Sequence, residues 1–135
     1  MVKFHRLMLI SQLSILCTIL HVSNLQAQSE HMVWQTDFHQ AMQQAKGENK
    51  YVLLNFSGSD WCANCIRLDN EVFNTPDFIA YADSYFVAYR ADFPVRKKNA
   101  MSIDMIKQNE QLAEQYNREG VFPLVLVLNA EGHPV

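Results

Sequence analysis

Two cysteines with two residues between them, Cys62 and Cys65, are the side chains in this sequence best suited to chemistry. They follow an apolar run at 51–56 and a short polar turn at 57–60, and a stretch with helical apolar spacing, 66–73, comes after them. The pair is therefore expected where a buried strand passes into a helix. Unpaired backbone N–H groups and the helix dipole at that position favour a thiolate on the first cysteine, so the pattern predicts thiol–disulfide chemistry.

Two other uses of the cysteine pair compete with this interpretation. A structural zinc site needs four ligands, but the third cysteine, Cys17, lies in an apolar leader, and His31, His39 and His133 are scattered without ligand spacing. We therefore expect no metal and no cofactor. A structural disulfide in a redox-inert binding or adaptor module stays open as the alternative, although so short a bridge closes too small a loop to stabilise the fold much.

The first 27 residues have the features of a secretory signal peptide. A basic start with Lys3 and Arg6 precedes a mostly apolar segment, 7–20, and Ala27 provides a small residue at the expected cut. The apolar segment is well short of the roughly 20 residues that a membrane span needs, so we expect cleavage after Ala27 rather than a retained anchor. Cys17 would leave with the leader.

Removal of this leader would leave one domain at 28–135, in the periplasm or secreted. Two of the 11 basic residues go with the leader, which leaves 9 against 14 acidic ones and a formal net charge of about −5. The only basic cluster is 96–98, in a polar stretch. Charge of this sign and distribution indicates neither nucleic acid nor an anionic membrane surface as a partner.

Predicted strands and helices alternate along the domain, which favours an α/β sandwich with a mixed sheet. Helix starts are indicated by Thr36-Asp37 and by Thr75 before Pro76, and Gly47 lies where the first helix should end. The expected helices are 38–45, 62–72, 76–82 and 102–117, and the expected strands are 51–56, 85–91 and 121–128, with a short leading strand at 33–35.

The segment 129–132 reads as a hairpin turn, with Gly132 at the position that needs a positive φ. Only three residues follow this turn, too few for a partner strand. We therefore expect this chain to be a C-terminally truncated form that lacks the last strand and a covering helix.

With these elements in order, the chain resembles the thioredoxin-like fold family. The resemblance rests on the strand before Trp61-Cys62-Ala63-Asn64-Cys65, on the strand that ends at Asp92, and on Gly120-Val121-Phe122-Pro123 before the last strand. The run from Gly58 to Cys65 is most similar to secreted bacterial thioredoxin-like thiol–disulfide oxidoreductases whose motif is Gly-Ser-Asp-Trp-Cys-x-x-Cys. The resemblance implies a sandwich with a central mixed sheet flanked by helices.

The site that follows has two catalytic and three substrate-binding residues. Cys62, at the open end of the helix, is expected to attack a disulfide, and the more buried Cys65 to resolve the mixed disulfide that forms. The resemblance implies that Pro123 is cis and faces the dithiol, and that an extended substrate pairs with the backbone of Phe122. Trp61 is expected to flank Cys62 at the rim, with a partly buried place in the core as the alternative.

One departure from the family concerns proton transfer. Asn55 stands where thioredoxin carries a buried aspartate thought to take the proton of the resolving thiol, and an amide cannot act as a base. Asp60 and Arg90 are weak substitutes, and Asp60 could instead raise the pKa of Cys62 by charge repulsion. The potential therefore does not carry over from the family.

The resulting prediction is an exported thiol–disulfide oxidoreductase, with reduction slightly favoured over oxidation. Its partners would be protein or small-molecule disulfides and, for a reducing role in an oxidising compartment, a membrane-linked dithiol electron donor. No stable membrane span is expected after the leader is cut. The adaptor remains the alternative, because Asn55 is consistent with a loss of efficient turnover.

Overall fold

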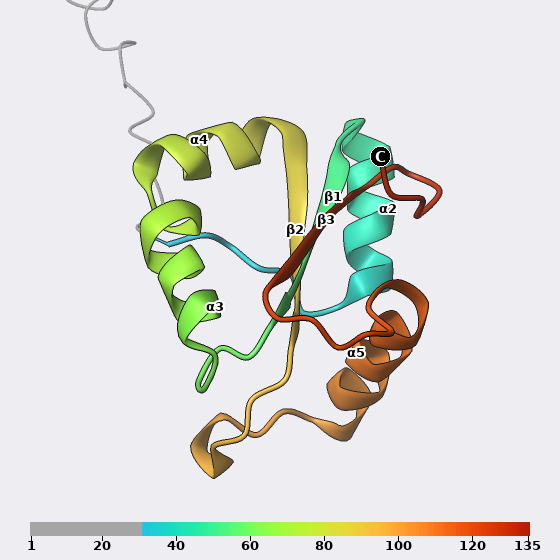
Figure 1. Cartoon of the computed structure of the whole chain (residues 1–135). Helices are drawn as coiled ribbons and strands as arrows, with labels where there is room; N and C mark the ends of the chain where they lie inside the picture. The colour runs from blue at the N-terminus through green and yellow to red at the C-terminus, as the bar shows by residue number, and fades with distance from the viewer. Residues whose placement is uncertain (1–30) are drawn as a thin grey trace, which may run out of the picture.

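A three-stranded mixed sheet forms the centre of the computed structural model, which describes residues 31–135 (Figure 1). The central strand β1, Tyr51–Ser57, pairs in parallel with β2, Phe86–Asp92, and antiparallel with β3, Leu124–Leu128. The predicted signal peptide and its cut after Ala27 lie outside the described residues.

Helices cover both faces of this sheet, which confirms the predicted thioredoxin-like sandwich (Figure 1). Helices α2, Phe38–Glu48, and α5, Ile103–Tyr116, lie on one face. The other face carries α3, Ala63–Leu68, the π-helical turn η1, Asp69–Phe73, and α4, Pro76–Tyr85. The 3-10 turn η2, Lys97–Asn99, lies between β2 and α5.

The continuous apolar sequence of β1 reflects burial on both of its faces. Val52, Leu54 and Phe56 point into the core beneath α2 and α5, and Leu53 points into a second core with Phe73 of η1. A central strand between two helical layers needs apolar residues at successive positions rather than at alternate ones. Beyond Leu53, however, the second face of β1 becomes polar.

The predicted helix starts are confirmed by their caps. The Asp37 carboxylate accepts from Gln40 N–H at 2.8 Å, and the Thr75 hydroxyl accepts from Phe78 N–H at 3.3 Å, with Pro76 in the first turn. The end of α2 differs from the prediction, because the helix passes Gly47 and stops at Asn49. Asn49 has a φ of 54°, a left-handed conformation that asparagine tolerates better than most residues.

Several predicted boundaries were wrong by a few residues. The helix expected over 62–72 is a short α-helix followed by η1, and Cys62 caps it from outside. Helix α4 extends to Tyr85, so β2 begins only at Phe86. Strand β3 begins at Leu124 rather than at 121, since Pro123 has no N–H to donate to a ladder. The leading strand at 33–35 is a single bridge between Gln35 and Tyr89.

The predicted turn at 129–132 is present at the C-terminal end. Gly132 has a φ of 82°, and the Asn129 N–H donates to the His133 carbonyl at 2.9 Å. Leu128 forms an antiparallel bridge with Pro134 beyond the turn. The chain therefore turns back alongside β3. Among the helices of residues 31–135, none is long and apolar enough to cross a membrane.

Candidate active site

Cys62 and Cys65 form a disulfide at the point where the chain leaves β1 and enters α3. Cys62 is the N-cap of α3, and its Sγ accepts a hydrogen bond from the Cys65 N–H at 3.2 Å. The two cysteines differ in exposure, since Cys62 keeps 8% of its surface and Cys65 only 1%. The sulfur at the helix start is thus the one that another molecule can reach.

The turn before the pair depends on Gly58. Its carbonyl accepts from the N–H groups of Trp61 and Cys62, at 3.2 and 2.9 Å. A Cβ at Gly58 would lie 2.3 Å from Cε2 of Trp61, far inside contact distance. The absence of a side chain at Gly58 therefore lets the indole ring lie against the turn.

The indole of Trp61 is fixed in place although 48% of its surface is exposed. Its Nε1–H donates to the Phe93 carbonyl at 2.8 Å, and its ring meets that of Phe122 edge to face, with centroids 5.7 Å apart. Phe122 in turn meets the ring of Phe93 at 5.5 Å. Three aromatic rings from three loops thus form one surface beside the disulfide.

The structure brings the predicted substrate-binding residues together. The peptide bond between Phe122 and Pro123 is cis, as the resemblance implied. Because the Phe122 ring contacts that of Trp61, the residue before the cis proline lies beside the turn that carries Cys62. Phe93 was missed as a member of this surface. Its sequence signal was its place directly after β2, at the sheet edge where β1 also ends.

Asp60, which was a weak candidate for proton transfer, is engaged elsewhere. Its carboxylate accepts from Val95 N–H at 3.0 Å, Arg96 N–H at 2.9 Å and Asn99 Nδ2 at 2.8 Å. These hydrogen bonds, that of Val95 first, hold the pKa of Asp60 below its usual value against the opposing effect of burial. Asp60 therefore anchors the 95–99 segment to the cysteine turn.

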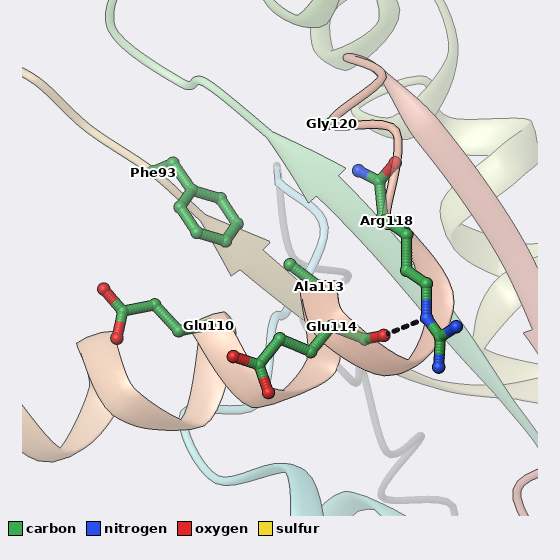
Figure 2. Close-up of a pocket in the computed structure, with 7 residues that line it drawn as sticks. Phe93, Glu110, Ala113, Glu114, Arg118 and Gly120 are labelled. Atoms are coloured by element: carbon green, nitrogen blue, oxygen red, sulfur yellow. Dashed lines mark hydrogen bonds between the residues drawn. The ribbon is translucent and has the colours of Figure 1, made fainter.

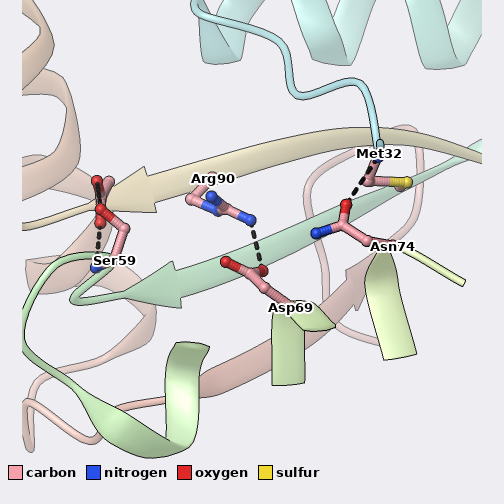
Figure 3. A network of polar contacts seen from close by, with 6 residues as sticks. Met32, Ser59, Asp69, Asn74 and Arg90 are labelled. Carbon is pink, nitrogen blue, oxygen red and sulfur yellow. Dashed lines mark hydrogen bonds and ion pairs between the residues drawn. The ribbon is translucent and has the colours of Figure 1, made fainter. Parts of the chain in front are cut away.

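Arg90, the other weak candidate, is also occupied (Figure 3). Its guanidinium forms an ion pair with Asp69 of η1 at 2.5 Å and lies over the ring of Trp34, 4.4 Å from the centroid. Burial raises the pKa of the Asp69 carboxyl, and the positive charge of Arg90 opposes that rise. This Arg90–Asp69 ion pair links η1, which directly follows α3, to β2.

The polar side of β1 lies next to this ion pair. Asn55 is paired in register with Arg90, and both Asn55 and Ser57 are buried. At the end of β2, the Asp92 carboxylate accepts from the Ser59 N–H and hydroxyl at 2.9 and 2.5 Å (Figure 3). Asn55, which replaces the carboxylate of the family, thus lies in a row of buried polar groups toward the ends of β1 and β2.

Two surface grooves meet at Phe93. One, of about 610 Å³, lies between α5 and the loop that follows it and is lined by Phe93, Glu110, Ala113, Glu114, Asn117, Arg118 and Gly120 (Figure 2). The other, of about 480 Å³, follows the segment from Asp92 to Met101. Neither groove includes a cysteine, so both lie to one side of the disulfide.

Within residues 31–135, no three His, Cys, Asp or Glu side chains lie together in a group that could hold a metal ion. The two sulfurs are bonded to each other. The chemistry that this arrangement offers is therefore that of a Cys-x-x-Cys pair at a helix start, with one accessible sulfur and one buried sulfur.

Comparisons with known proteins agree with this geometry. The chain is 29% identical over 102 residues to the disulfide bond reductase DsbH of Chlamydia pneumoniae, covering 76% of this chain and 59% of that protein. It is 27% identical over 129 residues to the thioredoxin-related protein DsbJ of the same organism, covering 90% of this chain and 36% of that one. It thus spans less than two thirds of the length of either relative.

Solved structures give the same result. A structure of a DsbH oxidoreductase has a TM-score of 0.70 at 28% identity and covers 83% of this chain and 78% of its own. A disulphide isomerase from Xylella fastidiosa Temecula1 is similar in fold, with a TM-score of 0.55 at 23% identity over 84% and 78% of the two chains. The family model for the thioredoxin-like domain matches residues 38–135. The chain therefore belongs to the thioredoxin-like domain family.

Proposed function

We propose that this chain is an exported thiol–disulfide oxidoreductase with Cys62 and Cys65 as its redox pair. The observation that carries the proposal is the placement of the two sulfurs. Cys62 caps the start of α3 near the surface, and Cys65 is buried about one turn further on. Similarity to a protein named as a disulfide bond reductase supports this chemistry and favours reduction as its direction.

The proposed reaction starts from the reduced pair. The Cys62 thiolate attacks one sulfur of a substrate disulfide, forms a mixed disulfide and releases the other substrate sulfur, which takes up a proton. Cys65 then loses its proton, and its sulfur attacks that of Cys62. The second substrate sulfur leaves as a thiolate, takes up the proton that Cys65 released, and the Cys62–Cys65 disulfide forms. Two electrons thus pass from the pair to the substrate, together with one proton from Cys65 and one from solvent.

The substrate side of this site consists of Trp61, Phe122 and Pro123. An extended protein segment, or a small-molecule disulfide, would lie over the Trp61 ring and pair with the backbone of Phe122. The support for this assignment is the fixed and exposed indole beside Cys62 and its contact with Phe122. A rigid aromatic surface binds a partner with little loss of side-chain entropy.

The direct test uses the two single cysteine variants. Cys62→Ser removes the attacking sulfur and should abolish reduction of a disulfide-linked fluorescent peptide. Cys65→Ser keeps the attacker but removes the resolving thiol, so it should accumulate a mixed disulfide visible by mass spectrometry under non-reducing conditions. Full activity in both variants would contradict the proposal, and circular dichroism checks that both remain folded.

Export and the electron donor belong to the same proposal. The leader at 1–27 would be removed and the domain 28–135 would act in the periplasm or medium, with a membrane-linked dithiol carrier returning electrons to the disulfide. Expression of the full chain in a Gram-negative host, followed by fractionation and N-terminal sequencing, tests it. The expected product begins at Gln28 outside the cytoplasm, and an uncut cytoplasmic chain would contradict export.

A redox-inert binding or adaptor module is the second candidate, and Asn55 is the observation that favours it. Position 55 carries an amide, and the carboxylates of Asp60 and Asp69 are engaged with the 95–99 segment and with Arg90, so removal of the resolving thiol's proton lacks its usual base. Titration of the pair against glutathione and its disulfide separates the two functions. A pair that passes between dithiol and disulfide within the range of a glutathione buffer supports the enzyme, and one that never opens supports the adaptor.

A further inference from the structure

Three buried polar atoms among the described residues have no hydrogen-bond partner, and all three lie on one face of the sheet. They are Asn55 Oδ1, Ser57 Oγ and Arg90 Nε. Asn55 and Ser57 share the face of β1 to which Leu53 belongs, and Arg90 is paired with Asn55 in register. Buried polar groups nearly always have hydrogen-bond partners, so two oxygens without partners on the same face of one strand require an explanation.

The helix above this face places Cys65 over the end of β1. Phe73 packs in the same core as Leu53, and the Asp69 carboxylate reaches Arg90, the partner of Asn55. Cys65 precedes Asp69 by four residues, about 6 Å of helix, and Ser57 follows Asn55 by two residues, about 6.6 Å of strand. Figure 1 shows α3 running back from the end of β1 beside the sheet, and these two lengths would bring Cys65 to the Ser57 end of the strand.

The burial of Cys65 agrees with this placement. It is the one buried residue of α3, and it shares the helix face of Asp69 and Phe73, which contact the sheet. Neither of the two apolar cores within residues 31–135 contains Cys65. Its burial outside both apolar cores is what a position at the polar end of β1 would produce.

We propose that Asn55 and Ser57 hold the Cys65 sulfur by hydrogen bonds when the pair is reduced. The Ser57 hydroxyl donates to the sulfur, and the Cys65 S–H donates to Asn55 Oδ1. A thiol can do both, whereas a disulfide sulfur has no hydrogen and is a poor acceptor. The two oxygens thus lack partners in the disulfide form and acquire them on reduction. The inference rests on the proposed redox cycling of the pair.

These two residues act as positioning residues that favour the dithiol. In the equilibrium with glutathione, two glutathione thiols give up two electrons and two protons, the Cys62–Cys65 bond breaks, and glutathione disulfide forms. Hydrogen bonds present only in the dithiol shift this equilibrium toward the reduced protein. A neutral amide and hydroxyl also leave the proton on Cys65, so Cys62 alone is the nucleophile at rest.

The test measures that equilibrium in the purified full domain and in two variants, Ser57→Ala and Asn55→Leu. Loss of one net hydrogen bond from the dithiol should raise the ratio of disulfide to dithiol about three- to tenfold at a fixed glutathione ratio. At 29.6 mV per factor of ten, the potential falls by about 14 to 30 mV. Ser84→Ala, which removes an exposed hydroxyl bonded to the Ala80 carbonyl, is the matched control and should change nothing.

Urea unfolding of both redox forms gives a second readout that a merely structural serine would not produce. Ser57→Ala should destabilise the dithiol form and leave the disulfide form unchanged or more stable, because it removes an orphaned hydroxyl there. Disulfide-to-dithiol ratios within twofold of wild type in both variants would overturn the inference. Equal destabilisation of the disulfide and dithiol forms would also overturn it, because that is the result expected if a buried water bonds these oxygens in both states. A wild-type pair that never opens would overturn the proposed function as well.

Discussion

At the scale of single residues, Gly58 determines where the exposed indole of Trp61 lies. A methyl group at Gly58 would come within 2.6 Å of three atoms of the indole, and that indole makes a hydrogen bond to Phe93 and a ring contact to Phe122. A side chain at this one position would thus displace the whole aromatic surface beside Cys62. The effect would reach the site without touching either sulfur.

We therefore expect Gly58→Ala to destabilise the fold by about 1–3 kcal/mol, the range for overpacked sites. It should also slow reduction of a peptide disulfide, because Trp61 must leave its contacts. Gly47→Ala is the matched control, since nothing lies within 4 Å of its Cβ and it sits inside α2. The control should stabilise the fold by about 0.5–1 kcal/mol. Urea unfolding measures both, and equal shifts would contradict the prediction.

The sequence located the cysteine pair and, through the family resemblance, Trp61, Phe122 and Pro123, but not the other groups around the pair. A Cys-x-x-Cys pair between a strand and a helix is local in sequence, and so are Trp61 and the proline of 120–123. Phe93 and Asp69 gain their roles from contacts over long sequence distances, 32 residues between Trp61 and Phe93 and 21 between Asp69 and Arg90. A pattern of apolar and polar positions does not encode which loops meet at the end of a sheet.

At the scale of elements, Asp60 joins the cysteine turn to the 95–99 segment. Hydrogen bonds hold its folded-state pKa below the unfolded value of about 3.9. The carboxylate therefore stabilises the fold above that unfolded value, and the contribution is lost as the pH falls through the lower folded-state pKa. The segment that it anchors carries the basic cluster Arg96-Lys97-Lys98.

Asp60→Asn should accordingly be less stable than wild type at pH 7, and the difference should shrink as the pH falls below about 4. The amide has one acceptor oxygen for three donors, so the 95–99 segment should also be cut faster by trypsin. Urea unfolding at pH 7 and pH 3 measures the first effect. The exposed Asp83 supplies the control variant Asp83→Asn, and a difference that is constant with pH would contradict the assignment.

The types and order of the helices and strands could be predicted from the sequence, whereas several of their first or last residues could not. Caps such as Asp37 and Thr75 use short local hydrogen bonds, so residue type predicts them well. The end of α2 was wrong because Asn49, not Gly47, takes the left-handed conformation. The π-helical turn at 69–73 has no residue signature and coincides with the ion pair between Asp69 and Arg90.

At the scale of the whole molecule, the two helical layers meet at the end of β2. The Asp92 carboxylate accepts a hydrogen bond from the Ser59 N–H, in the turn that leads to α3. The backbone carbonyl of Asp92 accepts one from Asn109 Nδ2 of α5 at 2.9 Å. Asn109 Oδ1 accepts in turn from the Tyr89 hydroxyl at 2.6 Å, and burial raises the pKa of Tyr89 to about 12. One buried amide thus ties α5 to the strand beside the cysteine layer.

Asn109→Leu should therefore lower the stability of the fold while leaving its redox equilibrium unchanged. The substitution orphans the Tyr89 hydroxyl and the Asp92 carbonyl, which together should cost about 2–4 kcal/mol in urea unfolding. The double variant with Tyr89→Phe also lacks the hydroxyl that Asn109→Leu leaves without a partner. It should therefore recover part of the lost free energy of unfolding, because replacing both partners of a buried hydrogen bond by apolar groups costs less than removing one. The disulfide-to-dithiol ratio against glutathione should stay within twofold of wild type in both variants, because Asn109 belongs to the opposite layer from Cys65. A large shift of that ratio would mean that the two layers are coupled through Asp92, and the separate roles assigned to them would then be wrong.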